Sequence, residues 1–144
     1  MKRIARSSIV AQPAATLYAL VLDVEAYPRF LPWCLEAKVH ERSAARLVAT
    51  LTVGVKGLRQ SFTTECVSRP CEAIDLSLIE GPFTHFHASW RLVPLNDAAT
   101  KIEFSLEYEF KTRLLATLLE PLFDHIANTM VDAFTRRAES TGRA

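Results

Sequence analysis

A long apolar segment near the C-terminus constrains the fold of this chain more than any other feature. Residues 114–137 have the sequence LLATLLEPLFDHIANTMVDAFTRR. Their apolar side chains recur every three or four residues, which places one set on a single stripe of an α-helix: Leu115, Leu118, Leu119, Leu122, Ile126, Met130 and Ala133. Pro121 predicts a kink or a restart, because proline removes the backbone hydrogen bond to Thr117. A helix with such a stripe needs an apolar surface to cover it.

The residues before this helix provide that surface as a series of strands. Between residues 102 and 110, apolar side chains alternate with Lys101, Glu103, Ser105, Glu107 and Glu109, which predicts a strand with one wet and one dry face. Alternating or β-branched runs predict further strands over residues 4–10, 47–55, 58–66, 74–78 and 86–92. Turns are expected between Gly54 and Gly57, at 69–70 and at 81–82, with a loop at 94–99.

Two short helical segments follow the first strand. Pro13 is suited to a helix start, so a helix is expected over residues 14–23. Aromatic residues then recur every three positions at Tyr27, Phe30 and Trp33, which indicates one or two helical turns that end before Pro32. The prediction is a single α+β domain over residues 1–144, with a curved antiparallel sheet of about six to seven strands and a long C-terminal helix.

Composition narrows the functional classes. The formal net charge is +1 and the isoelectric point is about 7.8, so no general attraction to nucleic acid is expected, and DNA is excluded as a partner. Basic residues gather only at the two ends, among them Arg136, Arg137 and Arg143. We expect a cytoplasmic protein with three reduced cysteines, since the chain has no apolar signal core and no run long enough to span a bilayer.

The sequence contains little that would support catalysis or metal binding. Phosphate-binding glycine loops, the nucleophile-elbow motif and the HExxH and CxxC patterns are all missing from it. His85 and His87 fall on the wet face of their strand without a third ligand, so no metal site is predicted there. Glu103, Glu107 and Glu109 form a solvated stripe. We therefore expect no catalytic residues, no metal and no required cofactor.

The segment Tyr27-Pro28-Arg29-Phe30-Leu31-Pro32-Trp33-Cys34 resembles the YPxFLPWC signature of a START-like family. This family contains coenzyme Q-binding START proteins and RatA-type ribosome-association toxins, and it is also classified as polyketide cyclase/dehydrase. The similarity extends from about residue 8 to residue 138 and includes residues 61–64, Gly81-Pro82-Phe83, Trp90 and residues 130–134. The resemblance implies the helix-grip fold, in which the curved sheet wraps around the C-terminal helix and encloses a hydrophobic tunnel. His85-Phe86-His87 departs from the family pattern.

Three functional hypotheses follow from the residues and the resemblance. The first is non-enzymatic binding of a hydrophobic ligand, ubiquinone or a related isoprenoid lipid, with transient contact to the inner-membrane surface. Its expected ligand-binding residues are Tyr27, Phe30, Trp33, Leu51, Phe62, Thr64, Leu76, Trp90, Phe104, Tyr108, Leu118, Leu122, Ile126 and Met130. The alternative is a toxin that binds the large ribosomal subunit and blocks subunit association. A cyclase-type enzyme ranks third, because Tyr108 is the one titratable residue expected on the inward face.

Two questions stay open at this level. The same apolar residues would show the same periodicity whether they fill a core or line a tunnel. The aromatic segment 27–33 is likewise compatible with a cap that closes the end of the barrel or with a mobile lid at the tunnel mouth. For a quinone, Gln60, Thr64 and Tyr108 are the expected polar groups, because a ligand pocket is mostly apolar with a few polar side chains.

Overall fold

The structure is a computed structural model that describes residues 1–141. Its elements in chain order are β1 (Lys2–Val10), α1 (Ala14–Leu22), the 3-10 helix η1 (Val24–Arg29), β2 (Cys34–Arg42), β3 (Arg46–Val55), β4 (Leu58–Arg69), β5 (Ala73–Glu80), β6 (Phe83–Asn96), β7 (Ala99–Phe110) and α2 (Arg113–Thr141). Arg143, part of the basic C-terminal end, lies outside the described residues.

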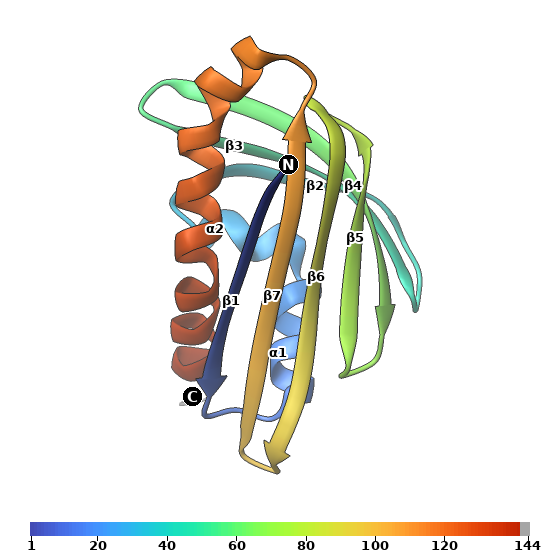
Figure 1. Cartoon of the computed structure of the whole chain (residues 1–144). Helices are drawn as coiled ribbons and strands as arrows, with labels where there is room; N and C mark the ends of the chain where they lie inside the picture. The colour runs from blue at the N-terminus through green and yellow to red at the C-terminus, as the bar shows by residue number, and fades with distance from the viewer. Residues whose placement is uncertain (142–144) are drawn as a thin grey trace.

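The seven strands form one antiparallel sheet in the order β1-β7-β6-β5-β4-β3-β2. Figure 1 shows a strongly curved sheet with α2 lying along it beside β1. The short helices α1 and η1 pack against α2 and the sheet, with Tyr27 of η1 in edge contact with Phe134 of α2. The α+β helix-grip architecture predicted from the sequence is confirmed.

The alternation predicted for β7 is also confirmed. Its five inward side chains are all buried: Ile102, Phe104, Leu106, Tyr108 and Phe110. In antiparallel pairing, directly opposed residues share a face, so Trp90 of β6 joins Phe104 on the inward side. Their ring centroids are 4.7 Å apart.

The phase of the α2 stripe differs from the prediction. Leu118, expected to face the sheet, is 50% exposed. The buried side chains of α2 are Leu119, Leu122, Phe123, Ile126, Ala127, Val131, Phe134 and Ala138. This set has the same helical spacing as the predicted one, but it is rotated toward the two phenylalanines. In a segment so rich in apolar residues, spacing alone does not determine which side faces the core.

The backbone shows the kink that was one of the two outcomes expected at Pro121, and it places the turn expected between Gly54 and Gly57 more narrowly. The helix α2 does not restart at Pro121 but continues through it, and its first turns bend relative to the rest (Figure 1). The β3–β4 turn consists of Lys56 and Gly57, both with positive φ, as two-residue hairpins favour. Gly54 instead lies within β3, where an added Cβ would come within 2.8 Å of the Leu35 side chain.

The expected loop at 94–99 is part of a longer hairpin. Strands β6 and β7 stay paired as far as Asn96 and Ala99. Pro94 is tolerated because the pairing of β6 with β5 ends before it. On that side of β6, the amide of Leu92 donates to the carbonyl of Glu72, in the turn that precedes β5. The edge strand β2 was not delimited from the sequence, since two register shifts interrupt its alternation. Among residues 1–141, no helix has the length and apolar character to cross a membrane.

Candidate functional site

The space between α2 and the sheet is mostly filled. Its main cavity has a volume of about 70 Å³, far below the roughly 300–1,000 Å³ of typical ligand pockets. The lining residues are Tyr27, Leu51, Phe62, Leu76, Phe86, Ala88, Trp90, Phe104, Leu106, Phe123, Ile126, Met130 and Phe134. This cavity is therefore too small to be the open tunnel that the family resemblance implies.

A second cavity of about 30 Å³ lies next to the first and shares Tyr27, Leu51, Leu76 and Trp90 with it. Of the described residues that line both cavities, Tyr27 is the one that carries a titratable group. Its hydroxyl donates to the carbonyl of Val21, and burial raises its pKa well above the ordinary value. The hydroxyl is therefore neutral and already engaged, so it offers no acid or base for catalysis.

An open groove of about 790 Å³ lies outside the main cavity, at the end of the sheet where β4 and β5 separate. Its lining includes Gln60, Lys111 and Leu115, and Phe62 lines both this groove and the main cavity. The Phe62 ring contacts Phe83, Phe86 and Phe123 at centroid separations of 5.7–6.3 Å. Phe62 is thus a wall between the groove and the interior.

Gly81 permits the position of this wall. A Cβ at residue 81 would lie 2.9 Å from the Cβ of Phe62 and 3.1 Å from the Leu78 side chain. Contacts below about 3.4 Å force neighbouring atoms apart, so a larger residue at position 81 would displace Phe62 or the turn.

The structure gathers nine of the fourteen expected ligand-binding residues around the two cavities: Tyr27, Leu51, Phe62, Thr64, Leu76, Trp90, Phe104, Ile126 and Met130. The other five line neither cavity: Phe30, Trp33, Tyr108, Leu118 and Leu122. Leu118 faces solvent, and Leu122 is buried in solid packing. Ten lining residues were missed: Phe86, Ala88, Leu106, Phe123 and Phe134 around the main cavity, and Val21, Val24, Ala49, Cys66 and Ile74 around the smaller one. Strand alternation places Phe86, Ala88 and Leu106 inward, so the sequence could have identified these three residues. It could not have identified Phe123 and Phe134, because spacing alone does not determine which side of α2 faces the sheet.

The aromatic segment 27–33 belongs to the core. Tyr27 and Trp33 are 7% and 2% exposed, and the rings of Tyr27, Phe30 and Phe134 meet edge to face with centroids 5.2–6.0 Å apart. This packing agrees with the cap that closes the barrel end rather than with the lid.

The three expected polar ligand contacts do not converge. Tyr108 donates to Asp124 Oδ1 over 3.3 Å, and Lys2 Nζ lies 3.3 Å from that same carboxylate oxygen. Gln60 lines the outer groove, whereas Thr64 lines the smaller inner cavity. Burial, followed by the Asp124 charge, raises the pKa of Tyr108, so its hydroxyl stays protonated at neutral pH.

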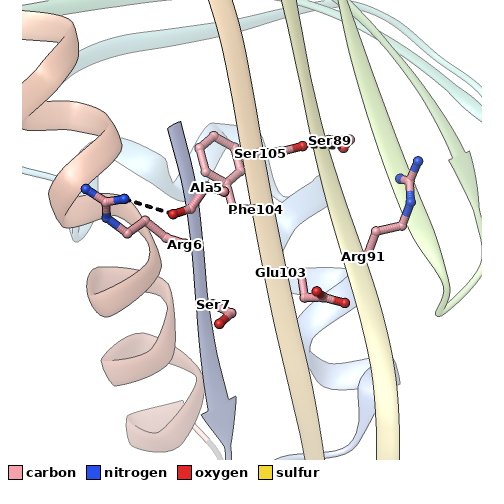
Figure 2. Close-up of a pocket in the computed structure, with 8 residues that line it drawn as sticks. All are labelled: Ala5, Arg6, Ser7, Ser89, Arg91, Glu103, Phe104 and Ser105. Carbon is pink, nitrogen blue, oxygen red and sulfur yellow. Dashed lines mark hydrogen bonds between the residues drawn. The ribbon is translucent and has the colours of Figure 1, made fainter. Parts of the chain in front are cut away.

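A shallow depression of about 400 Å³ crosses the outer face of β1, β7 and β6 (Figure 2). Small side chains line it, namely Ala5, Ser7, Ser89 and Ser105, with Arg91 and Glu103 at its border. Figure 2 also shows Arg6 turned toward α2, with its guanidinium on the carbonyl of Ala5.

The charges on this outer face largely neutralise one another. Arg91 pairs with Asp75 at 3.2 Å. His85 Nε2 lies 3.0 Å from Glu107, which lies 3.3 Å from Arg3. These contacts hold the pKa of Glu107 below its ordinary value, with the His85 hydrogen bond as the main cause. The two histidines are on the wet face as predicted, and no group of metal-binding side chains occurs among residues 1–141.

The three cysteines are free, and they should differ sharply in reactivity. Burial raises the thiol pKa of Cys34 and of Cys66 from 9.0 to about 11, whereas Cys71 is half-buried in a turn. Two pKa units reduce the thiolate fraction about 100-fold. At pH 8 a thiol-specific disulfide reagent should label Cys71 rapidly and the other two slowly.

The same shifts predict a loss of stability in alkali. Unfolded thiols ionise near pH 9, whereas the buried thiols of Cys34 and Cys66 ionise near pH 11. Their contribution to the free energy of unfolding is therefore intact below pH 9 and is lost as pH rises toward 11. In the labelling experiment at pH 8, equal rates at the three cysteines would contradict the burial of Cys34 and Cys66.

Comparison with known proteins identifies the family. The profile described as "Polyketide cyclase / dehydrase and lipid transport" matches residues 10–135. This protein belongs to that polyketide cyclase/dehydrase family. It is 43% identical over 136 residues to the "Ribosome association toxin RatA" of Pseudomonas aeruginosa, an alignment that covers 94% of both chains.

Two other proteins are less similar to this chain in sequence. The coenzyme Q-binding protein COQ10 homolog B of Xenopus laevis is 29% identical, and the alignment covers 92% of this chain but 56% of that protein. The crystal structure of the Zhui aromatase/cyclase from Streptomyces sp. R1128 superimposes with a TM-score of 0.88 at 19% identity, covering 99% and 96% of the two chains. That likeness supports the fold alone. RatA is thus more similar to this chain than the coenzyme Q-binding protein is.

Proposed function

We propose that this protein is a ribosome-directed toxin of the RatA type, which binds the large ribosomal subunit and hinders subunit association. The observation that carries the proposal is the 43% identity to RatA over 94% of both chains. This supports the alternative hypothesis from the sequence better than it supports the quinone hypothesis.

The geometry is consistent with a protein that acts through its surface. Ligand-binding proteins of this size offer an interior pocket of roughly 300 Å³ or more, whereas the main cavity here has about 70 Å³. The cavity also lacks a group for acid–base catalysis, since the Tyr27 hydroxyl is engaged by a backbone carbonyl. We therefore assign a non-enzymatic role in the cytoplasm, where ribosomes are found.

Sedimentation tests the ribosomal hypothesis. The purified protein is mixed with purified large subunits, small subunits or neither, and the mixtures are centrifuged through sucrose gradients at low salt. We expect the protein to move with the large subunits and to be released as salt is raised, because phosphate contacts weaken with ionic strength. A protein that stays at the top of the gradient with large subunits present would rule out the proposal.

Binding of a hydrophobic ligand is the second candidate function, and one observation favours it. The interior cavity is lined almost entirely by apolar side chains, and among residues 1–141 Phe62 alone lines both this cavity and the groove of about 790 Å³. A ubiquinone-like ligand would have to enlarge the cavity, with the unbranched side chain of Met130 as an adaptable part of the lining. Organic extraction of protein purified from cells, followed by mass spectrometry, tests this candidate; repeated preparations without lipid would reject it.

A further inference from the structure

The side chain of Arg137 is held in an unusual position near the C-terminal end of α2. Its guanidinium carbon lies 5.3 Å above the centre of the Phe30 ring. Its Nε atom is buried and has no hydrogen-bond partner among the described residues. Phe30 is fixed in turn, because its ring packs at 5.2 Å against Phe134 and at 6.0 Å against Tyr27. The stacked guanidinium is therefore pre-positioned on a rigid aromatic support.

Two more arginines flank this contact. Arg29 precedes Phe30 in the chain and Arg136 precedes Arg137, and the side chains of both are exposed. Among the ion pairs of residues 1–141, none includes Arg29, Arg136 or Arg137. We call Arg29, Phe30, Arg136 and Arg137 the Arg137 surface. It joins two segments that are more than 100 residues apart in the sequence.

Most other arginines of the described sheet are already neutralised. Arg46 contacts Glu41 and Glu65 at 2.9 and 2.6 Å, Arg42 contacts Glu25 at 2.9 Å, and Arg91 contacts Asp75. An arginine that already forms an ion pair within the protein contributes little to the binding of a negatively charged partner. The Arg137 surface thus concentrates unneutralised positive charge in a protein whose net charge is only +1.

We infer that the Arg137 surface binds the phosphodiester backbone of ribosomal RNA; the inference rests on the proposed ribosomal function. Phosphate contacts position a protein without reading base sequence, and the planar guanidinium fork suits them. A stacked arginine loses little rotamer freedom on binding, because Phe30 already orders it. One local patch also suffices for a protein without a strongly basic overall composition.

A salt series with large subunits measures the contribution of each charge. Three variants, Arg29→Gln, Arg136→Gln and Arg137→Gln, are compared with the wild-type protein by quantitative sedimentation. A plot of log affinity against log salt has a negative slope. Each lost phosphate contact should make this slope shallower by about 0.7–0.9 and should weaken binding roughly five- to tenfold near 0.1 M salt. The matched control is Lys56→Gln with Arg59→Gln, two exposed cations without ion pairs at the β3–β4 hairpin, which should leave the slope unchanged.

Two variants separate the stacked geometry from charge alone. Arg137→Lys keeps the charge but loses the planar fork, and Phe30→Leu removes the aromatic support while the charge is unchanged. Both should bind several-fold more weakly than the wild-type protein. Thermal unfolding of each variant confirms that the fold is retained, and Arg137→Lys decides the matter if Phe30→Leu is unstable.

The outcomes distinguish this inference from the proposed function. If the wild-type protein does not bind large subunits, both fail. If it binds and the arginine variants keep the wild-type affinity and salt slope, the inference fails and the proposed function stands. A slope change in the Lys56→Gln and Arg59→Gln control alone would place the RNA contact at the hairpin and overturn the inference. If the arginine variants lose thermal stability but keep the wild-type affinity and salt slope, the arginines stabilise the C-terminal end of α2 and the inference fails.

Discussion

Replacing Phe134 with alanine is expected to lower the free energy of unfolding by about 3–5 kcal/mol. Phe134 is 1% exposed and lines the main cavity, and its ring meets those of Tyr27, Phe30 and Trp90 at centroid distances of 5.1–5.3 Å. Alanine would remove these contacts and enlarge a cavity that the rigid aromatic neighbours cannot close. Urea denaturation followed by circular dichroism measures the change.

The matched control is Leu118→Ala on the same helix. Leu118 belongs to the stripe that spacing predicts, but its side chain is half-exposed, so the substitution should change stability by no more than about 0.5 kcal/mol. Equal losses at positions 118 and 134 would mean that α2 presents a different side to the sheet. The pair therefore tests the phase of the helix directly.

Replacing Phe62 with alanine is expected to produce two large effects together. Loss of a ring that is 9% exposed should cost about 3–5 kcal/mol of stability. The same change removes the wall between the groove and the main cavity, so the variant should bind an apolar fluorescent dye or a short-chain ubiquinone more tightly than the wild-type protein does. Dye titration and thermal shift with the quinone measure the gain.

Phe110→Ala provides the control for this second effect. Phe110 is 8% exposed and its ring packs against Phe83, Tyr108 and Phe123, but it lines neither the groove nor the cavity. The Phe110→Ala variant should lose a similar amount of stability to the Phe62→Ala variant, but it should not gain affinity for the dye or the quinone. Equal dye binding by the two variants would show that general loosening, and not removal of the wall, admits the dye.

The fold was predictable because the sheet presents one wet and one dry face. Strict alternation along β7 places every second residue from Ile102 to Phe110 on the inward side, and antiparallel pairing transfers that assignment to β6 and β1. The phase of α2 was not predictable from the same kind of evidence. Its apolar residues occupy more than one helical stripe, and tertiary packing selects the one that contains Phe123 and Phe134.

The candidate site was predictable only in part, for a physical reason. Residues that line a tunnel and residues that fill a core have the same periodicity, and the volume left between them depends on side-chain packing that periodicity does not report. Here Phe62, Phe86, Phe123 and Phe134 reduce the space to about 70 Å³. The Arg137 surface was likewise hidden, because Phe30 and Arg137 lie 107 positions apart in the sequence. The sequence showed only that basic residues gather at the ends of the chain.

Subunit association is the most direct test of the proposed function. Light scattering follows the joining of purified large and small subunits after the large subunits have been incubated with an excess of this protein. The account predicts slower and less complete association with the wild-type protein, and near-normal association with the variant that combines Arg29→Gln, Arg136→Gln and Arg137→Gln. Unchanged association in the presence of saturating wild-type protein would contradict the account.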